Sequence, residues 1–496
     1  MTNLKNTILK NSNKWHKWLG WAGGLTLLMF AISGMMHPLM TWTGPGATSF
    51  FPPQAVMKAE YAAAMPRILE QNGIKAAIMA KVVPTDKNPV LQLTEHNDEA
   101  RRYFDLGTGE ELEGYDPIHA VWLARYYTGL KDTPVKGVVF QSSFDSAYPW
   151  VNRLLPIYRV EFDTDDNLTA FIYTELGALG SLTNNWKTSV QGIFRFLHTW
   201  SWLDQFEQPR VILMMVLLVS LIGMAATGTA MVFLMKNRKL PVKYRRWHRW
   251  VSYVVWIPLL GFSASGSYHL LQYAYGDNHR GLQLGQPVQL TPERFGNQVS
   301  SLKQYQNVTL NGLSLVESPD GRLLYRLSIP QGRPGQKVVR AQRYDGVPIE
   351  KSALYFDALS GQESAITDED MAIYYAKKHL GFEDSAITGV YPVTHFGPHY
   401  DFRNKRLPVW RIDYDSSLGD KVFIDPASGI LVDRLVDTER YEGYSFSFLH
   451  KWNFLSPLIG RASRDALIVL VLLIAVAGTV TGYIMLLKSR RAKGKR

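Results

Sequence analysis

Four long runs without charged residues interrupt the mixed pattern of hydrophobic and polar positions along the chain. The runs are Trp18–Met40, Val211–Leu234, Trp250–Tyr275 and Ala466–Leu487. Each run reaches the roughly 20 residues that an α-helix needs to cross the hydrocarbon layer of a membrane. Because backbone groups in lipid must bond to one another, each run is expected to form a helix. The sequence therefore predicts a membrane protein with four transmembrane α-helices.

Two long segments between these helices show the shorter patterns of soluble α+β structure. The alternating runs Val409–Tyr414 and Lys421–Ile424 predict two strands of a hairpin. Asp368–Leu380 predicts an amphipathic helix, with acidic residues at its start and Lys377 and Lys378 in its last turn. The expected boundaries are a tail at 1–17, a helix at 18–40, an outer domain at 41–205, a helix at 209–235, an inner loop at 236–249, a helix at 250–272, a second outer domain at 273–462, a helix at 465–487 and a tail at 488–496.

Positive charge is concentrated in the two tails and the inner loop, which contain no acidic residue. These charges are Lys5, Lys10, Lys14 and Lys17; Lys236, Arg238, Lys239, Lys243, Arg245, Arg246 and Arg249; and Lys488, Arg490, Arg491, Lys493, Lys495 and Arg496. Together they exceed the net charge of +11, so the rest of the chain is net acidic. Basic residues beside helix ends mark the cytoplasmic side. We therefore expect a multi-pass protein of the bacterial inner membrane, with both termini in the cytoplasm and the outer domains in the periplasm. The basic loop is expected to contact membrane lipid rather than nucleic acid.

Several motifs occur twice, which predicts two tandem halves. Trp15–Trp18 and Ile32–His37 recur 232 residues later, as Trp247–Trp250 and Ala264–His269. Leu155–Asp163 and Phe196–Trp200 recur 252 residues later, as Leu407–Asp415 and Phe448–Trp452, and Thr227-Gly228 resembles Thr481-Gly482. Each half has one helix leading outward, a long outer segment and one helix leading inward. The halves are therefore expected to be related by a pseudo-twofold axis along the membrane normal.

Six of the 12 histidines fall at repeated positions. They are His16, His37 and His198 in the first half and His248, His269 and His450 in the second. Ionisable side chains at membrane helices are costly to bury and are usually functional, and imidazole is a standard ligand of haem iron. The chain has no cysteine, which excludes thiolate metal sites and the covalent attachment of c-type haem. The histidines therefore predict b-type haem held by coordination.

The spacing of the histidines suggests how haem would be held. His37 follows His16 by 21 residues, and His269 follows His248 by the same number, a rise of about 32 Å along a straight helix. His16 and His248 are expected to clamp one haem at the cytoplasmic side. The outer side has four candidate ligands, His37, His198, His269 and His450. One symmetric pair of them would hold one outer haem, and two cross-pairings would hold two outer haems. The total is then two or three haems. A separation of about 32 Å is long for one electron hop, so a deeper outer haem or bridging aromatic residues would be needed.

The second outer segment resembles a known domain. Trp410–Asp413 followed by Val422–Gly429 resembles the core of a PepSY domain, and the histidine-headed helices resemble the PepSY-associated transmembrane family. The first segment is less similar, because Phe171–Gly177 lacks the Asp-Pro of the second. Members of this family include inner-membrane reductases of ferric siderophores and other iron(III) chelates, with haem in the membrane. The resemblance best matches His16, His198, His248 and His450.

A loop in the second outer segment, His395–Asp401, contains two histidines, a tyrosine and an aspartate. His395 and His399 are candidate metal ligands that would touch the iron substrate, although an ordinary polar turn would have the same composition. The remaining histidines His96, His119, His279 and His379 are expected at the surface.

These observations predict a haem-b ferric reductase that moves electrons across the membrane to a periplasmic iron(III) chelate or siderophore. The inner loop is too short for the βαβ unit of roughly 30 residues that binds a dinucleotide. The donor is therefore expected to be quinol or a cytoplasmic flavoprotein. Two alternatives remain open: an anchor whose PepSY-like domains bind a periplasmic partner without catalysis, and a metal-ion transporter.

Overall fold

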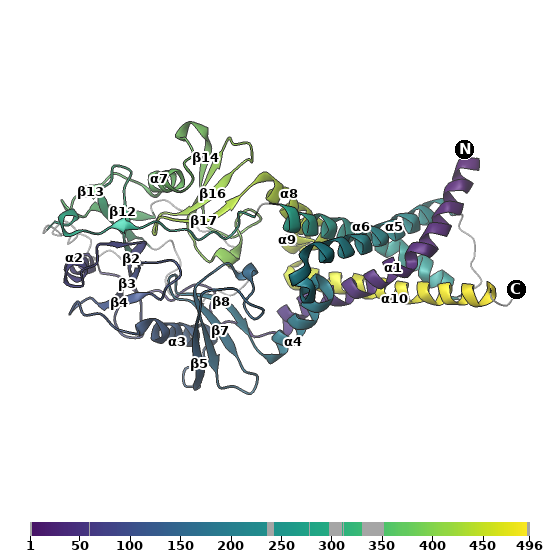
Figure 1. The fold of residues 1–496 in the computed structure, drawn as a ribbon, viewed down its shortest axis with the longest axis horizontal. Helices are drawn as coiled ribbons and strands as arrows, with labels where there is room; N and C mark the ends of the chain where they lie inside the picture. The colour runs from purple at the N-terminus through teal and green to yellow at the C-terminus, as the bar shows by residue number, and fades with distance from the viewer. Residues whose placement is uncertain are drawn as a thin grey trace. The chain divides into compact units, whose positions relative to one another are not determined.

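The chain folds into two compact units, a helical one and one rich in β-structure (Figure 1). The computed structural model describes residues 2–58, 60–235, 243–276, 278–296, 310, 312–329 and 352–493. The helical unit comprises Met1–Gly44, Trp186–Asn278 and Thr438–Arg496, and the β-rich unit comprises Pro45–Asn185 and His279–Asp437. Five residues of the predicted basic segments, Lys236, Arg238, Lys239, Lys495 and Arg496, lie outside the described residues.

The helical unit confirms the prediction of four membrane-length helices. In the described ranges, four helices are long and apolar enough to cross a membrane. They are α1 (Thr2–Thr43), α5 (Glu207–Leu234), α6 (Lys243–Tyr275) and α10 (Arg461–Lys493). Helices α1, α6 and α10 continue well beyond their apolar runs, and α1 includes most of the predicted N-terminal tail. Because α1 and α6 each pack against both α5 and α10, α1 and α6 occupy diagonal positions in the bundle.

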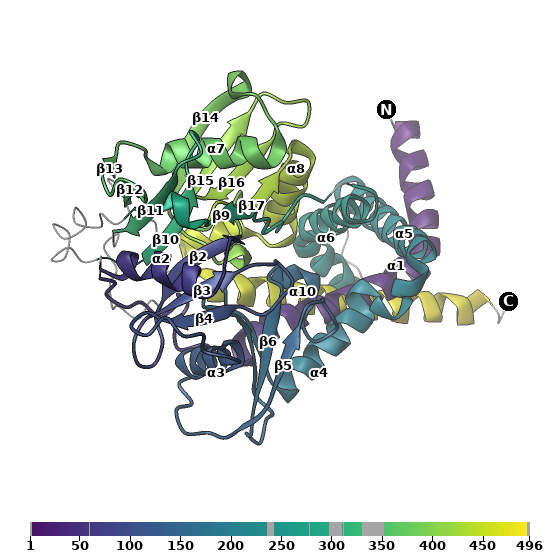
Figure 2. The same cartoon turned by 60° about the vertical axis from the view of Figure 1, so that its left-hand side comes forward.

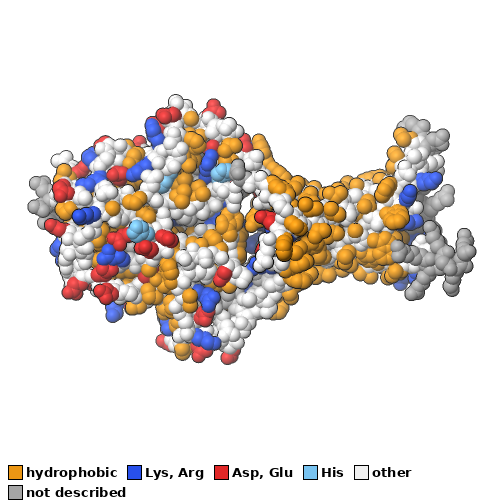
Figure 3. Space-filling view, viewed as in Figure 1, with side chains coloured by type: hydrophobic (Ala, Val, Ile, Leu, Met, Phe, Trp, Pro, Cys, Tyr) orange, Lys and Arg blue, Asp and Glu red, His pale blue; other side chains and the backbone are white. Residues whose placement is uncertain are grey.

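The surface of the bundle has the distribution expected of membrane helices. Hydrophobic side chains cover its length, and Lys and Arg side chains gather at the end where the chain termini lie (Figure 3). At this end Trp15, Trp18, Trp247 and Trp250 are exposed, and tryptophan is enriched where a membrane meets water. Leu27, Leu221, Val255 and Leu472 contribute to the apolar core inside the bundle.

Short helical segments connect the bundle helices to the β-rich unit. Before α5 these are α4 (Asn185–Phe194), the π-helical turn η2 (Arg195–Thr199) and η3 (Ser201–Phe206). Before α10 they are α8 (Asp437–Ser445), the π-helical turn η9 (Phe446–His450), η10 (Asn453–Leu455) and α9 (Ser456–Ile459).

The β-rich unit contains a seven-stranded sheet to which both outer segments contribute (Figure 2). Its strand order is β13-β12-β11-β10-β2-β3-β4. The strands of this sheet are β2 (Met79–Val83), β3 (Val90–Thr94), β4 (Arg102–Asp105), β10 (Gly312–Glu317), β11 (Leu323–Ser328), β12 (Ala353–Asp357) and β13 (Glu363–Ser364). A separate two-stranded pair consists of β1 (Ala76–Ala77) and β9 (Val288–Gln289). In the centre, β2 pairs antiparallel with β10, so Leu313 faces Val82. The two expected outer domains therefore share one sheet and one hydrophobic core.

Two four-stranded antiparallel sheets complete this unit. They are β5 (Val135–Gln141), β6 (Ile157–Phe162), β7 (Thr169–Tyr173) and β8 (Ala178–Thr183), and β14 (Ile387–Val393), β15 (Val409–Tyr414), β16 (Lys421–Asp425) and β17 (Ile430–Leu435). Helix α3 (Tyr115–Thr128) packs on the first sheet and α7 (Asp368–Leu380) on the second. The predicted hairpin and the predicted helix at 368–380 are confirmed. The Thr367 hydroxyl and the Asp370 carboxylate form a capping box that fixes the start of α7.

A buried ion-pair network also links the two outer segments. The Glu175 carboxylate accepts a hydrogen bond from Lys81 Nζ at 2.9 Å and forms a second ion pair with Arg406. Arg406 in turn lies 3.1 Å from Asp425. Burial opposes ionisation of Glu175, but the charges of Arg406 and Lys81 outweigh it and hold the pKa of this carboxyl well below its usual range. Charge pairing therefore reinforces the shared sheet.

His119 is buried, so the expectation that it lies at the surface is wrong. Its side chain is only 2% exposed on α3, where its ring lies 5.3 Å from that of Tyr103 and stacks on Trp122 at 5.4 Å. His119 is buried because it lies on the side of α3 that packs against the core, where Ala120 and Leu123 are buried as well. Burial, with a smaller effect of the Lys81 charge, lowers the pKa of His119 to about 3.

The change His119→Met is expected to make the stability of the protein depend less on acidic pH. Methionine is chosen because Met371 occupies the position 252 residues later, which is the offset of the repeated motifs. The unfolded chain takes up a proton near pH 6.5 and the folded chain does not, so stability falls as the pH drops below 6.5, by up to about 1.4 kcal/mol per unit. Thermal unfolding of both proteins in detergent between pH 7 and pH 4.5 measures this difference. The exposed His96, changed to Met, serves as the control, and parallel pH profiles for wild type and His119→Met would contradict the assignment.

Candidate functional site

Two of the predicted histidines meet inside the bundle near the end that carries the basic residues. His16 on α1 and His248 on α6 face each other, with ring centroids 6.2 Å apart and ring planes inclined by 61°. The helices that carry them are diagonal in the bundle, so the pair lies across its centre. We refer to His16 and His248 as the first pair.

Hydrogen bonds fix the orientation of both rings of the first pair. His16 Nδ1 lies 2.9 Å from the Met224 carbonyl oxygen, and His248 Nδ1 lies 2.9 Å from the Gly478 carbonyl oxygen. A carbonyl oxygen can only accept, so Nδ1 must carry the proton in each ring. The unprotonated Nε2 of each ring is then available as a ligand.

Glycines on the neighbouring helices make room for these rings. A Cβ atom at Gly228 would lie 3.1 Å from His16 Cε1, and a Cβ atom at Gly482 would lie 3.1 Å from His248 Cε1. Both distances are tighter than ordinary van der Waals contact. The repeated Thr-Gly motif therefore marks the positions at which α5 and α10 approach the first pair.

A second pair is formed by His198 and His450, whose ring centroids are 6.3 Å apart with planes inclined by 83°. Each histidine lies in a π-helical turn, a conformation that is frequent at functional sites. Each turn is closed by an i→i+5 bond, from Trp200 N–H to the Arg195 carbonyl and from Lys451 N–H to the Phe446 carbonyl. A π-helical turn therefore contains each histidine, as the fourth residue of the turn for His198 and as the fifth for His450.

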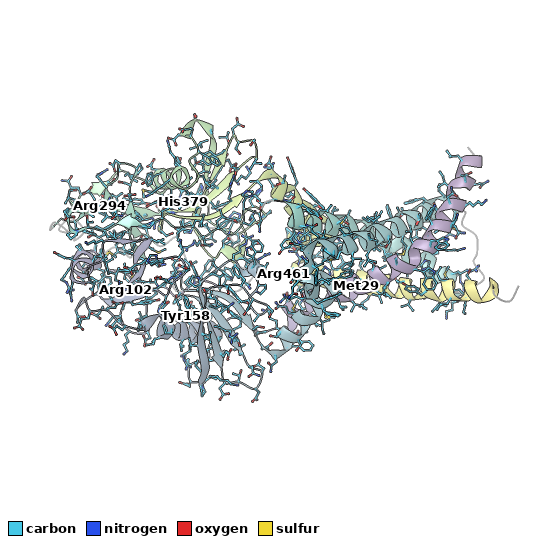
Figure 4. All side chains as sticks on the ribbon, in the orientation of Figure 1. Met29, Arg102, Tyr158, Arg294, His379 and Arg461 are labelled. Carbon is cyan, nitrogen blue, oxygen red and sulfur yellow. The ribbon has the colours of Figure 1, made fainter. Side chains whose placement is uncertain are left out.

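Serine hydroxyls hold the rings of the second pair. His198 Nδ1 lies 2.9 Å from Ser33 Oγ, and His450 Nδ1 lies 3.2 Å from Ser265 Oγ. Each serine donates its own proton to the carbonyl four residues earlier, Ser33 to Met29 (labelled in Figure 4) and Ser265 to Gly261, both at 2.7 Å. The serine oxygens must therefore accept from Nδ1, which again leaves each Nε2 without a proton.

Aromatic rings enclose the second pair. The Phe194 ring stacks on His198 at 4.7 Å, and the Phe446 ring stacks on His450 at 4.5 Å. Phe30 contacts His198 edge-on at 5.3 Å, so apolar surface surrounds the imidazole.

His37 and His269 are not placed in either pair. Both side chains are exposed, on the outer turns of α1 and α6. His269 Nδ1 lies 2.7 Å from a carboxylate oxygen of Glu442, and the His269 ring stacks on Phe446 at 4.5 Å. Of the six repeated histidines, the structure thus places four in two pairs. His269 belongs to neither pair, although its ring shares the stacked Phe446 with His450.

The loop with His395 and His399 is held by hydrogen bonds of its own residues, and the predicted contact of these histidines with an iron substrate stays a prediction. Tyr400 is buried, and its hydroxyl donates to the Arg406 carbonyl at 2.9 Å. The Asp401 carboxylate accepts from the Arg403 backbone N–H at 2.9 Å. In the described part of the chain, no group of three or more His, Cys, Asp and Glu side chains is placed to bind a metal ion. The contacts of Tyr400 and Asp401 are those of an ordinary polar turn.

Both histidine pairs have the spacing that one metal atom between two imidazoles requires. A ligating nitrogen lies about 2 Å from the metal and about 1 Å from the centre of its ring, so the two ring centroids should be about 6 Å apart. The observed values are 6.2 and 6.3 Å. Since no third His, Cys, Asp or Glu is placed beside either pair in the described residues, a metal there would need its other ligands from a non-protein group.

The second pair lies deeper in the bundle than the sequence suggests. Ser33, which holds His198, follows His16 by 17 residues, a rise of about 26 Å, whereas His37 would have given about 32 Å. The difference is about one helical turn. Apolar side chains, Leu27 and Leu221 among them, fill the bundle between the pairs.

Several residues at these pairs were not predicted as functional. Ser33 and Ser265 lie in the repeated motifs that end at His37 and His269, and Gly228 and Gly482 lie in the repeated Thr-Gly motif. Their recurrence in both halves is the signal that could have identified them. The carbonyls of Met224 and Gly478 carry no such signal, because any residue supplies a carbonyl.

Comparison with models of known protein families finds no match, and comparison with curated proteins finds no related sequence. The resemblance to the PepSY-associated transmembrane family therefore stays a prediction.

Alanine in place of Gly228 is expected to displace the His16 ring and reduce the haem predicted at the first pair. Alanine stabilises a helix better than glycine does. Any loss of bound haem would therefore come from the new Cβ atom, which would lie 3.1 Å from His16 Cε1. Absorption spectra of the purified protein measure the bound haem. Gly192→Ala, where a Cβ atom meets nothing within 4 Å, is the control. Equal haem in the two variants would show that the close approach at Gly228 is unimportant.

Proposed function

We propose that the protein is a transmembrane haem-b oxidoreductase that carries electrons to periplasmic iron(III). The observation that carries the proposal is the presence of two imidazole pairs, at 6.2 and 6.3 Å, each with Nδ1 hydrogen-bonded and Nε2 left as a ligand. Metal-ligating histidines usually have this second hydrogen bond. A planar porphyrin supplies the four ligands that the protein does not, so one b haem per pair fits the site.

The proposed orientation places the first pair at the cytoplasmic side, because the basic residues gather at that end of the bundle (Figure 3). Tandem duplication accounts for the matching surroundings of the two histidines in each pair. The antiparallel β2–β10 contact at the middle of the seven-stranded sheet also suits a pseudo-twofold axis. Of the expected outer domains 41–205 and 273–462, Pro45–Asn185 and His279–Asp437 would then form a joint periplasmic structure, whereas Trp186–Asn278 and Thr438–Arg496 belong to the helical unit.

The chain's own residues would hold and shield the cofactor. A haem at each pair would supply a one-electron carrier. His16 with His248, and His198 with His450, would each hold one haem through Nε2. The apolar core around Leu27, Leu221 and Val255 would keep water away from the region between the pairs.

The substrate assignment comes from the family resemblance. Iron(III) bound by a chelator or siderophore is the proposed acceptor, because reduction to iron(II) weakens the hold of hard oxygen ligands and releases the metal for uptake. Quinol or a cytoplasmic flavoprotein is the proposed donor. His37, His269, His395 and His399 have no assigned part in holding haem in this proposal.

The alternative functions fit the pairs less well. A transporter that passes bare metal ions would be expected to offer more than two ligands at a site, since zinc usually takes four. An anchor that only binds a partner would not need paired imidazoles with fixed orientation. The spectrum of the purified protein separates the three functions.

Protein purified from cells supplied with porphyrin is expected to show a Soret band and sharp reduced-minus-oxidised bands of b-type haem. A pyridine haemochrome assay should give two haems per chain. Each of the changes His16→Ala, His248→Ala, His198→Ala and His450→Ala should remove about half of the haem, because one axial ligand is lost.

The matched controls are His37→Ala and His269→Ala, which should keep both haems. A colourless wild-type protein would overturn the proposal. If it then bound zinc or copper, the transporter would be favoured, and if it bound neither, the anchor would be favoured.

Reduction of iron(III) can be followed directly. Protein reduced without oxygen and mixed with ferric citrate or a ferric hydroxamate siderophore is expected to lose its reduced haem bands as iron(II) appears in equal amount. A colorimetric iron(II) chelator measures the product. Apoprotein made without porphyrin is the control, and haem bands that stay reduced with both chelates would rule out this substrate class.

A further inference from the structure

The two histidine pairs differ in the atoms that accept their Nδ1 protons. In the first pair the acceptors are the Met224 and Gly478 carbonyls, each at 2.9 Å. In the second pair the Ser33 hydroxyl oxygen accepts from His198 at 2.9 Å. His450 has the Ser265 hydroxyl oxygen at 3.2 Å and a further contact with the Phe262 carbonyl. Hydroxyls also lie near the first pair, but farther from Nδ1: Thr227 at 3.4 Å from His16 and Thr481 at 3.5 Å from His248. The short serine contact therefore distinguishes the second pair.

This difference has a chemical consequence. A peptide carbonyl oxygen carries more negative charge than an alcohol oxygen and is the stronger acceptor. A stronger bond at Nδ1 makes the imidazole a more basic ligand, and hydrogen bonds around a metal site tune its reduction potential. A more basic ligand stabilises iron(III) relative to iron(II), so it lowers the potential.

Water cannot easily replace the serines. Ser33 and Ser265 are 0% and 1% exposed, and each hydroxyl proton is committed to a carbonyl within its own helix. The hydroxyl oxygen therefore always presents a lone pair to Nδ1.

Charged groups near the second pair are largely paired. Arg210 lies 2.6 Å from Asp204, Arg464 forms an ion pair with Asp465, and His269 contacts Glu442. These charged groups therefore occur beside the second pair together with partners of opposite charge.

We propose that Ser33 and Ser265 are positioning residues that give the haem at the second pair a higher reduction potential than the haem at the first pair. The inference rests on the proposed function. It gives electron transfer a built-in direction: an electron that enters at His16 and His248 is more stable at His198 and His450, on the side of the iron(III) substrate.

Potentiometric titration of the haem-loaded protein tests this inference. His198→Ala keeps only the haem of the first pair, and His16→Ala keeps only that of the second. The remaining haem is expected to have a higher midpoint potential in His16→Ala than in His198→Ala. Wild-type protein should titrate in two steps at the same two potentials.

The serines are tested individually in the full-length protein. Ser33→Ala removes the acceptor of His198 and should raise the potential of the second-pair haem further, while the first-pair haem stays unchanged. Ser33→Thr keeps the hydroxyl and should return the potential towards the wild-type value. Ser263→Ala is the matched control, because Ser263 is a buried serine of α6 that donates to the Leu259 carbonyl.

The outcomes separate this inference from the proposed function. A protein without haem would overturn both. A haem-loaded protein in which the first pair has the higher potential, or in which Ser33→Ala and Ser263→Ala behave alike, would overturn the inference and leave the oxidoreductase intact.

Discussion

The hydrogen bond at each imidazole Nδ1 is the interaction on which the site depends. A buried N–H without a partner costs free energy, and in an apolar bundle no water is available to replace the partner. Met224, Gly478, Ser33 and Ser265 supply the acceptors. The same bond also decides which ring nitrogen stays unprotonated. One contact per histidine therefore satisfies a buried donor and presents Nε2 to the centre of the bundle.

Different backbone geometries produce this result at the two depths. The first pair lies within regular helices, and Gly228 and Gly482 allow neighbouring helices to come close enough for a carbonyl to reach Nδ1. The second pair lies in π-helical turns, and a left-handed residue follows each: Trp200 directly after the first turn, at φ 53°, and Trp452 two residues after the second, at φ 50°. Such conformations are unfavourable for residues other than glycine. They persist because the imidazole, its stacked phenylalanine and the serine hold the turn in place.

The sequence predicts those features that have a local or a repeated signal. The apolar runs identify the four helices, the acidic start and basic end identify α7, and the duplicated Trp15–Trp18 motif places His16 opposite His248. Features without such a signal were missed. Nothing local indicates that β2 pairs with β10, more than 200 residues away. The sequence left His37, His198, His269 and His450 open as outer ligands. Helical spacing assumes a regular helix and does not indicate the π-turns that carry His198 and His450.

The shared sheet joins residues from distant parts of the chain within the β-rich unit. Each pair takes one imidazole from each half, so a metal between them requires the halves to stay in register to well below 1 Å. Helix packing in a membrane allows sliding, because lipid is as apolar as the helix surfaces. The β2–β10 pairing and the Glu175–Arg406 ion pair join the outer segments of the two halves. A backbone ladder has a discrete register, since a slip by one residue would turn every side chain to the wrong face. The pairing therefore fixes the register of the two segments within the β-rich unit, while the imidazole spacing of 6.2 and 6.3 Å is set within the helical unit.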